Sequence, residues 1–334
     1  MKAAIRDRYG PPDVVQLSDI DRPVPIDDQV LVRVQAASIN RADLDLLRPE
    51  PGFTRLFLGL RKPKDRQVGC DVAGVVEAVG PNVTRFQPGD AVFGDMYAYG
   101  LGGFAEYKCA PEKAFLAIPE GMAVEDAATL PHAAILAIQG LRRRDGRTVR
   151  SGSKVLIDGA SGNVGPFAVQ VAKAMGCEVT GVCSANKADF VRSLGADHVI
   201  DYATVDYTTT GERYDWILDV HGHHPILRSR RALRSNGVYV TLGGPTARIL
   251  QSIVLGPVIS ITGRKRMGLM LWWKPFKAED VATLATLMAE GQLATAIDRR
   301  FPLAEVVDAL HYVDEGHPKG KVVITMSDEP RGPS

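Results

Sequence analysis

Apolar positions in the first third of the chain follow the period of β-strands. Val30–Ala36 alternates apolar and polar residues, which is typical of a strand with one buried face. Val72–Val79 is more continuously apolar, as in a fully buried strand, and Gly80-Pro81-Asn82 ends it with residues that favour turns. Short strands separated by turns predict a compact barrel or sandwich for residues 1–110.

From Lys154 onward the pattern changes to strands that alternate with helices. A strand is predicted at Val155–Ile157, followed by a helix that ends at Met175. The same rhythm continues with a strand at Glu178–Cys183, a helix at Lys187–Leu194, and short strands at His198–Ile200, Trp216–Val220, Val238–Leu242 and Val258–Thr262. This alternation predicts an α/β fold with a doubly wound parallel sheet.

After Pro275 this alternation stops. Two amphipathic helices are predicted, at Ala278–Glu290 and around Val306–Val313, and Gly320–Met326 is predicted to be a strand. The tail Ser327–Ser334 has a composition typical of disorder. A chain of 334 residues with this change of pattern is expected to form two domains.

Composition narrows the class of protein. Forty Lys and Arg residues against 39 Asp and Glu leave a net charge of +1, which argues against a general binder of nucleic acid or of acidic membranes. The longest uncharged runs, Ala127–Leu141 and Ile249–Gly263, are too short for a membrane span. The N-terminus has no apolar signal-peptide core, and the four cysteines suggest no disulfide framework. We therefore expect a cytoplasmic protein.

Glycine is concentrated in two segments, residues 69–103 and 152–165. The second carries Gly159-Ala-Ser-Gly-Asn-Val-Gly165 between a predicted strand and a predicted helix. In a dinucleotide site, Gly159 or Ala160 would make the tight turn, Gly162 would admit the pyrophosphate, and Gly165 would let the helix pack on the strand. The alternative is an ordinary glycine turn of a βα unit, but the flanking strand and helix favour the dinucleotide site.

The end of the next predicted strand indicates which dinucleotide is bound. An NAD site usually has an acidic residue there to bind the ribose 2′-hydroxyl, and this chain has none. Ser184 can donate a hydrogen bond and Lys187 adds positive charge, which suits the 2′-phosphate of NADP(H). The alternative is that Ser184 caps the following helix and Lys187 is solvated.

Several segments together resemble the medium-chain dehydrogenase/reductase superfamily, and most closely its zinc-free, quinone oxidoreductase-like branch. The resemblance implies a β-rich GroES-like catalytic domain made of residues 1–125 and 266–334, with a Rossmann NADP(H)-binding domain, residues 126–265, inserted in it. It further implies an active site in the interdomain cleft, and relatives of this kind are often homodimers. The segments that carry the resemblance are Val30–Asp43, Gly69–Gly94, Gly102–Pro111, Gly159–Gly165 and Gly195–Tyr202.

The resemblance also implies roles for individual residues. Asn40 and Asp43 match an Asn-x-x-Asp pattern beside the reacting centre, and Tyr202 matches a tyrosine that flanks the adenosine end of the cofactor. Leu242-Gly243 ends a strand on the nicotinamide side. The residues that match the pyrophosphate loop and the 2′-phosphate site are Ser161, Gly162, Asn163, Val164, Ser184 and Lys187.

Zinc-dependent relatives have ligands where this chain has Asn40, Cys70 and His132. Only two of these three are possible zinc ligands, and the amide makes a tetrahedral zinc site improbable. We therefore expect a zinc-independent enzyme. Cys70 is interpreted as a small buried side chain, and the cluster His221, His223 and His224 as a loop, although such a cluster can also bind a metal by accident.

These observations favour an NADPH-dependent oxidoreductase that reduces an activated C=C bond or a quinone, because this chemistry needs no Lewis acid. Asn40 would donate a hydrogen bond to the substrate oxygen, and His132 would polarise the carbonyl or deliver a proton. Both residues could instead be structural. Two other functions stay open: an alcohol dehydrogenase, with or without zinc, and an NADPH-binding sensor or structural protein with little turnover.

Overall fold

The structure, a computed structural model, describes residues 1–49, 52–271, 274 and 276–326, and the chain divides into two compact units. The first unit contains Met1–Ala133, Pro275–Ala278 and Ile297–Ser334. The second contains Ala134–Lys274 and Glu279–Ala296. The first unit is therefore discontinuous, as the resemblance implied. The predicted disordered tail, Ser327–Ser334, lies outside the described residues.

A seven-stranded sheet forms the centre of the first unit, with strand order β14-β15-β3-β4-β5-β7 and with β6 also paired to β3. The C-terminal strand β15 pairs antiparallel with β3, and Val322 lies opposite Ile39. Strands β1 and β2 form a separate antiparallel pair. The strands are β1 (Lys2–Arg6), β2 (Val15–Asp19), β3 (Gln29–Ile39), β4 (Asp71–Val79), β5 (Ala91–Asp95), β6 (Tyr107–Pro111), β7 (Phe115–Ala117), β14 (Ile297–Pro302) and β15 (Lys321–Thr325).

Two apolar clusters stabilise this unit. One gathers Val32, Val72 and Phe115 from strands β3, β4 and β7. The other packs helices α1 and α10 against the ends of β3 and β15, through contacts that include Leu44 and Leu310. The helices of this unit are α1 (Arg41–Leu47), α2 (Arg55–Leu58), α3 (Val124–Thr129) and α10 (Val306–Asp314).

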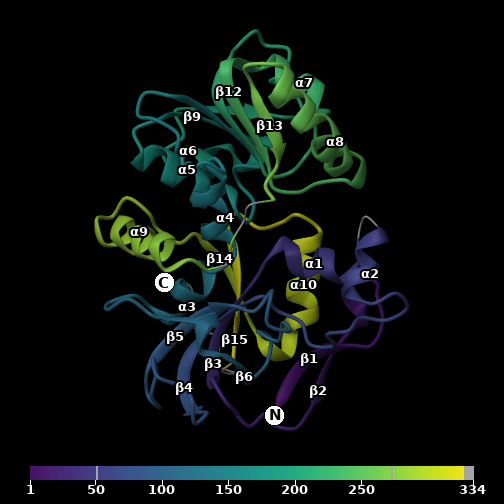
Figure 1. The fold of residues 1–334 in the computed structure, drawn as a ribbon, viewed down its shortest axis with the longest axis vertical. Helices are drawn as coiled ribbons and strands as arrows, with labels where there is room; N and C mark the ends of the chain where they lie inside the picture. Colours follow the sequence, from purple (N-terminus) through teal and green to yellow (C-terminus); the bar gives the residue numbers. More distant parts are fainter. Residues whose placement is uncertain (50–51, 272–273, 275, 327–334) are drawn as a thin grey trace. The chain divides into compact units, whose positions relative to one another are not determined.

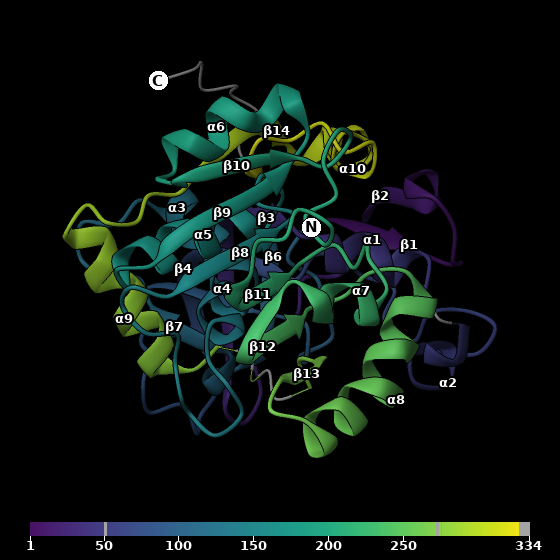
Figure 2. The ribbon, with the colours of Figure 1, turned by 90° about the horizontal axis from the view of Figure 1, so that it is seen from above.

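The second unit is built on a six-stranded parallel sheet with strand order β10-β9-β8-β11-β12-β13, which is seen strand by strand in Figure 2. This order, with a switch between β8 and β11, is that of a doubly wound Rossmann sheet. The strands are β8 (Lys154–Asp158), β9 (Glu178–Cys183), β10 (His198–Asp201), β11 (Tyr214–Asp219), β12 (Leu233–Thr241) and β13 (Arg266–Leu269). The prediction of a doubly wound parallel sheet is confirmed.

Helices cover both faces of this sheet (Figure 1). On one face, Leu218 of β11 touches Gly140 of α4, and Gly181 of β9 touches Val191 of α6. The other face packs against α7 and α8 in a cluster that includes Ile217. The helices are α4 (Ala133–Gly140), α5 (Gly165–Ala174), α6 (Ala188–Ser193), α7 (Ile226–Arg231), α8 (Thr246–Thr262) and α9 (Ala278–Ala289).

The strand predicted at Val258–Thr262 is wrong, because these residues are the last turns of helix α8. Five residues are too few to distinguish a period of two from a helical period. Within the helix, the hydroxyls of Ser260 and Thr262 donate to the carbonyls four residues earlier. The sixth strand is β13, which begins at Arg266 and pairs with β12.

The predicted domain boundaries differ from the two units at their C-terminal side. The prediction assigned residues 266–334 to the catalytic domain, but β13 completes the sheet of the second unit. Most of α9 also belongs to that unit, where Asp280 forms an ion pair with Arg142 at 2.8 Å. The chain therefore crosses between units more than once after Leu269, and no composition change marks these crossings.

Candidate active site

Asn40 lies where strand β3 ends and helix α1 begins. Its backbone N–H donates to the carboxylate of Asp43 at 2.7 Å. A side chain three residues into a helix that binds back to the capping residue is the arrangement of a capping box. The Asn-x-x-Asp spacing therefore has a local structural cause, which holds Asn40 at the edge of the sheet.

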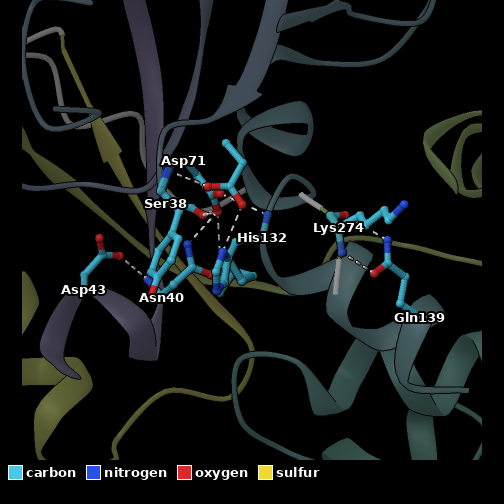
Figure 3. Close-up of polar contacts among 10 residues, drawn as sticks. Ser38, Asn40, Asp43, Asp71, His132, Gln139 and Lys274 are labelled. Atoms are coloured by element: carbon cyan, nitrogen blue, oxygen red, sulfur yellow. Dashed lines mark hydrogen bonds and ion pairs between the residues drawn. The ribbon is translucent and has the colours of Figure 1, made fainter. Parts of the chain in front are cut away.

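The carboxylate of Asp71, the first residue of β4, joins the surrounding segments. Its Oδ2 accepts from the Ser38 hydroxyl at 2.6 Å and from the Asn40 side-chain amide at 2.7 Å. Its Oδ1 accepts the backbone N–H of His132 at 3.0 Å. Figure 3 shows these side chains converging on Asp71. One buried carboxylate therefore holds both residues that the sequence analysis proposed as catalytic.

Lys321, the first residue of β15, is the positive partner in this cluster. Its Nζ donates to the side-chain oxygen of Asn40 at 2.7 Å and to the carbonyl oxygen of Ile39 at 3.2 Å. It also lies 3.6 Å from Asp71 Oδ2. The lysine is 1% exposed and Asp71 is fully buried. Such a buried pair is tolerated because further hydrogen bonds satisfy both charged groups.

Burial shifts the pKa values of Asp43, Asp71 and Lys321 in this cluster. Burial raises the pKa of Asp43 to about 6. It also raises the pKa of Asp71, although the Lys321 ammonium opposes this shift. For Lys321 itself, burial lowers the pKa and Asp71 opposes the change. The three donors on Asp71 favour its ionised form, so we assign Asp71 and Lys321 as an ion pair.

His132, which directly precedes α4, forms a second charged contact. Its Nδ1 lies 3.0 Å from Asp95 Oδ2, at the end of β5. Asp95 Oδ1 accepts the backbone N–H of Tyr97, whose ring lies 5.7 Å from that of His132. Burial lowers the pKa of His132, but the carboxylates, chiefly Asp95, raise it, and the net shift is upward. The pair therefore favours the protonated ring more than solvent alone would.

The structure tests whether Asn40, Cys70 and His132 could hold zinc. The Asn40 side-chain oxygen already accepts from the Lys321 ammonium, and a cation there would repel a metal ion. Burial, reinforced by Asp43 and Asp95, raises the pKa of the Cys70 thiol well above its usual range, although zinc binds the thiolate. These three residues do not fit a zinc ion. Zinc independence of the whole protein stays a prediction.

The predicted dinucleotide loop connects β8 to α5 in the second unit. Gly159 has φ +87°, a conformation that side chains disfavour, and its N–H donates to Val182 O at 3.1 Å. A Cβ at Gly165 would lie 2.2 Å from Gly159 O, so this position requires glycine. At Gly162, by contrast, the nearest atom to an added Cβ is 3.6 Å away. The protein itself therefore leaves room at Gly162.

The remaining loop residues surround the first turn of α5. Ser161 and Val164 are buried, and Gly162 and Asn163 are partly exposed. Pro166 occupies the first turn, where its missing N–H is not needed. A helix of this length presents N–H groups and a positive dipole end toward the loop. Room at Gly162 in front of this helix end fits a dinucleotide pyrophosphate.

The residues predicted to bind a 2′-phosphate follow β9. Ser184 directly follows the strand, and its hydroxyl is 2.7 Å from the side chain of Asn186 rather than capping the next helix. Lys187 lies one turn further on and is partly exposed. Tyr202 is 54% exposed, and its N–H donates to Cys183 O at the end of the same strand. These three residues thus gather at the carboxyl end of β9.

Leu242 and Gly243 directly follow strand β12. The N–H of Leu242 donates to Asp219 O at 2.9 Å, and the carbonyl of Gly243 accepts from Thr241. No atom lies within 4 Å of a Cβ added at Gly243, so the chain leaves space there too. Both residues occupy the carboxyl edge of the sheet, where ligands bind in doubly wound folds.

The histidine cluster lies in the loop after β11. The N–H groups of His221 and Gly222 donate to Asp219, which fixes the start of the loop. The ring centres of His221 and His223 are 4.9 Å apart, and His224 lies 3.6 Å from Asp206. In the described part of the chain, no group of three His, Cys, Asp or Glu residues has the arrangement of a metal site. The interpretation as a loop agrees with these contacts.

Lys321 and Asp95 belong to the cluster but carry no recognisable signal in the sequence. Lys321 begins an apolar run and looks like a polar residue at a strand edge. Asp95 is five residues after a tight turn, like many exposed aspartates. The role of Lys321 arises only because β15 pairs with β3, and the role of Asp95 only because β5 ends beside His132. The three hydrogen-bond donors to Asp71 come from 31 to 61 residues away, so no local sequence pattern connects them to it.

Comparisons with known proteins agree with this architecture. Residues 26–120 match the alcohol dehydrogenase GroES-like domain family, and residues 194–324 match the zinc-binding dehydrogenase family. A solved quinone oxidoreductase from Coxiella burnetii superposes with a TM-score of 0.85 at 30% identity, covering 98% of this chain and 99% of that one. The predicted GroES-like and Rossmann-like architecture is confirmed.

Several curated relatives cover most of the chain. A chloroplast envelope quinone oxidoreductase homolog of Arabidopsis thaliana is 33% identical over 90% of this chain and 91% of its own length. A mitochondrial NAD(P)H oxidoreductase of Mus musculus is 30% identical, over 98% of this chain and 89% of its own. A trans-enoyl reductase of Aspergillus terreus is 31% identical, over 90% and 87%.

The chain belongs to the medium-chain dehydrogenase/reductase superfamily. Within that superfamily it is an oxidoreductase related to quinone oxidoreductases, in a family of NAD(P)H-dependent enzymes. Among the helices that the structure describes, none combines the length and apolar character needed to cross a membrane.

Proposed function

We propose that the protein is an NADPH-dependent reductase that acts on an activated C=C bond of an α,β-unsaturated carbonyl compound, or on a quinone. The contact of His132 with Asp95 carries this proposal, because it places in a buried cluster a titratable ring whose protonated form the carboxylate stabilises. The relatives described as quinone oxidoreductases and as a trans-enoyl reductase support the substrate class.

When bound, NADPH supplies a hydride from its nicotinamide. The protein's own part is to stabilise the negative oxygen that forms as the substrate is reduced, and to supply one proton. The Asn40 NH2 group, one N–H of which donates to Asp71, would donate its other N–H to the substrate oxygen. His132 polarises the carbonyl as an imidazolium and then delivers its proton, and Asp95 holds the ring in place. One hydride and one proton convert a quinone to a hydroquinone, or an enone to a saturated carbonyl.

We further propose that NADPH is preferred over NADH. Ser184 and Lys187 follow β9 where an NAD site usually has an acidic residue, and the next residues of this chain include none before Asp189. A serine hydroxyl and an ammonium suit a phosphate. Residues Gly159, Ser161, Gly162, Asn163, Val164 and Gly165 would hold the pyrophosphate, Tyr202 the adenosine end, and Leu242 and Gly243 the nicotinamide side.

The test is oxidation of NADPH by the purified protein with a panel of enones, quinones and aldehydes. Turnover of enones or quinones that persists after chelation, in protein without stoichiometric zinc, is the expected result. Zinc bound one to one, with turnover lost on its removal, would instead indicate a zinc-dependent alcohol dehydrogenase. Tight NADPH binding without oxidation by any of the panel would indicate a sensor.

We propose that the protein is a homodimer. Strand β13 is at an edge of the six-stranded sheet, and α8 beside it exposes an apolar stripe. A second copy would bury both. Sedimentation should give about twice the chain mass of 36.1 kDa, and a monomer at micromolar concentration would contradict the proposal. The stripe is made of Leu250, Ile253, Val254, Val258 and Ile261.

We propose a cytoplasmic location. All four cysteines are free thiols in the structure, which suits a reducing compartment. Cell fractionation tests this directly, because some relatives are chloroplast or mitochondrial proteins. Recovery in an organelle fraction would contradict it.

A further inference from the structure

The ammonium of Lys321 is buried against the residue that the proposed function uses as a hydrogen-bond donor. Three oxygens surround Nζ: Ile39 O at 3.2 Å, Asn40 Oδ1 at 2.7 Å and Asp71 Oδ2 at 3.6 Å. An ammonium has three N–H donors, so this environment matches its capacity. The register of β15 on β3 causes the approach, because Val322 lies opposite Ile39.

These contacts determine which way the Asn40 amide faces. Its oxygen accepts from the ammonium of Lys321, and its NH2 group donates to the carboxylate of Asp71 at 2.7 Å. Rotating the amide by half a turn would place NH2 against the ammonium and oxygen against the carboxylate. Both contacts would become repulsive in a buried environment, where such interactions are strong. Two opposite charges therefore select one orientation.

Lys321 also acts on His132 through Asp71. The carboxylate that receives the Asn40 amide also accepts the backbone N–H of His132 at 3.0 Å. A fully buried carboxylate needs a positive neighbour to stay ionised, and Lys321 is the lysine that touches it. The other titratable groups that act on Asp71 are His132 and Asp95, and Asp43 and Cys70 lie in the same cluster.

We propose that Lys321 is a positioning residue of the active site: it fixes the orientation of the Asn40 amide and, through Asp71, the place of His132. This inference rests on the proposed function for its catalytic consequence. The orientation itself depends only on the contacts of the first unit.

The first test observes the amide directly. The Asn40 side-chain ¹H–¹⁵N signals are identified by their loss in Asn40→Ala and are then compared between the native protein and Lys321→Met. Methionine keeps an apolar stem of similar length and removes the charge. We expect the Asn40 signals to shift and their amide protons to exchange faster. Unchanged position and exchange in Lys321→Met would overturn the proposal.

Lys108→Met is the matched control. Lys108 is another buried lysine of the same unit, 6% exposed, and its Nζ donates to Tyr99 O at 3.0 Å. This substitution removes a buried ammonium without touching Asn40 or Asp71. The Asn40 signals should stay in place. Equal shifts in both lysine variants would mean that general loosening moves the amide, which would overturn the proposal.

The second test asks whether Lys321 acts through Asn40 in catalysis, using kcat in a double-mutant cycle. Lys321→Met should lower kcat roughly 10- to 100-fold, as expected for a misplaced catalytic group, with little change in the KM for NADPH. In the Asn40→Ala background the same substitution should add no more than about threefold, because residues that act as a unit are not additive. Full multiplication of the two effects would overturn the proposal.

Two outcomes need separate treatment. Circular dichroism shows whether Lys321→Met folds. If it does not, Asp71→Asn replaces Lys321→Met in both tests, because it removes the carboxylate that connects Lys321 to Asn40 and His132 at nearly constant side-chain volume. If the native protein reduces no enone or quinone, the proposed function fails, while the Asn40 signals still decide whether Lys321 orients the amide.

Discussion

Asp158 and Asp219 are register partners at the carboxyl ends of the adjacent strands β8 and β11, and both carboxyl groups are buried. Asp219 accepts from Tyr239 and from two backbone N–H groups, whereas Asp158 Oδ2 has no hydrogen-bond partner in the described structure. Burial raises the pKa of both groups, and the Asp219 charge reinforces the shift at Asp158. One proton is therefore retained on the pair above the usual range for a carboxyl group.

Asp158→Asn should therefore stabilise the protein at alkaline pH. A carboxyl whose pKa is raised by folding costs no stability below its unfolded pKa, near 3.9, and costs more as the pH rises toward its folded pKa. The amide removes this cost. We expect the free energy of unfolding to increase by about 1–3 kcal/mol at pH 8, with a smaller gain at pH 5. Urea unfolding at the two pH values measures it.

Asp219→Asn is the matched comparison. Its carboxylate accepts three hydrogen bonds, and an amide would turn an NH2 group toward one of those donors. We expect this variant to lose stability at both pH values. An equal gain in stability in Asp219→Asn would contradict this assignment, because it would mean that Asp219, and not Asp158, holds the retained proton.

Gly162→Ala and Gly165→Ala should separate cofactor binding from folding. A Cβ at Gly162 meets nothing closer than 3.6 Å, so the variant should unfold at nearly the native temperature. Its methyl group would instead occupy the space assigned to the pyrophosphate and weaken NADPH binding by roughly tenfold or more. Fluorescence titration with NADPH checks this, and native affinity in Gly162→Ala would contradict the assignment of the loop.

Gly165→Ala should lower the stability of the fold itself, whether or not cofactor is bound. Its Cβ would lie 2.2 Å from Gly159 O and 2.5 Å from the carbonyl carbon of Ala160, both of which are backbone atoms. The loop and helix α5 would have to separate. We expect a loss of about 1–3 kcal/mol in the free energy of unfolding, measured without cofactor.

Lys187→Ala should change the preference between cofactors. Loss of a charge-assisted contact to the 2′-phosphate should weaken NADPH binding by roughly 10- to 100-fold. NADH has no such phosphate, and its affinity should change little. Calorimetric titration of both cofactors into the native protein and the variant measures the ratio. A native preference for NADH would exclude the phosphate site after β9.

The pH dependence of turnover should follow the contact of His132 with Asp95. Since the pKa of His132 is raised, the protonated ring stabilises the fold below its unfolded pKa, and this contribution is lost as the pH rises through the folded value. If the ring supplies the proton, kcat should fall over the same interval. In Asp95→Asn the carboxylate that raises the pKa of His132 is gone, while burial still lowers it. The fall of kcat with rising pH should therefore begin at a lower pH.

His132→Gln tests the same role by removing the titrating group. We expect kcat to fall roughly 10²- to 10⁴-fold, with the basic limb absent from the pH–rate profile. A profile that keeps its basic limb in His132→Gln would assign the proton to another residue.

The sequence alone predicted the parts of this fold that depend on local patterns. The β8–loop–α5 region was predicted because a strand, a glycine turn and a helix follow one another within 21 residues, Lys154–Ala174. Strands β3 and β4 were predicted from their apolar positions. Val258–Thr262 was misassigned because a short apolar run in a helix and one in a strand look alike.

The polar cluster depends on pairing between distant segments, and no local pattern reports that. Asn40 could be named from the family resemblance, but its partner Lys321 is 281 residues away. Likewise, the upward shift in the pKa of His132 depends on Asp95, 37 residues away. Burial gives these groups their chemistry, and burial is a property of the folded sheet.

The pairing of β15 with β3 has a consequence for biosynthesis. During synthesis Ser38, Asn40 and Asp71 leave the ribosome early, and the counter-charge of Lys321 follows 281 residues after Asn40. Until then Asp71 lacks this lysine partner, and residues 36–39 of β3 lack their neighbour β15, while residues 29–33 already pair with β6. The second unit, whose sheet is made from 154–269, is complete earlier. The sheet of the second unit should thus be able to form before Lys321 reaches the acidic centre of the first unit.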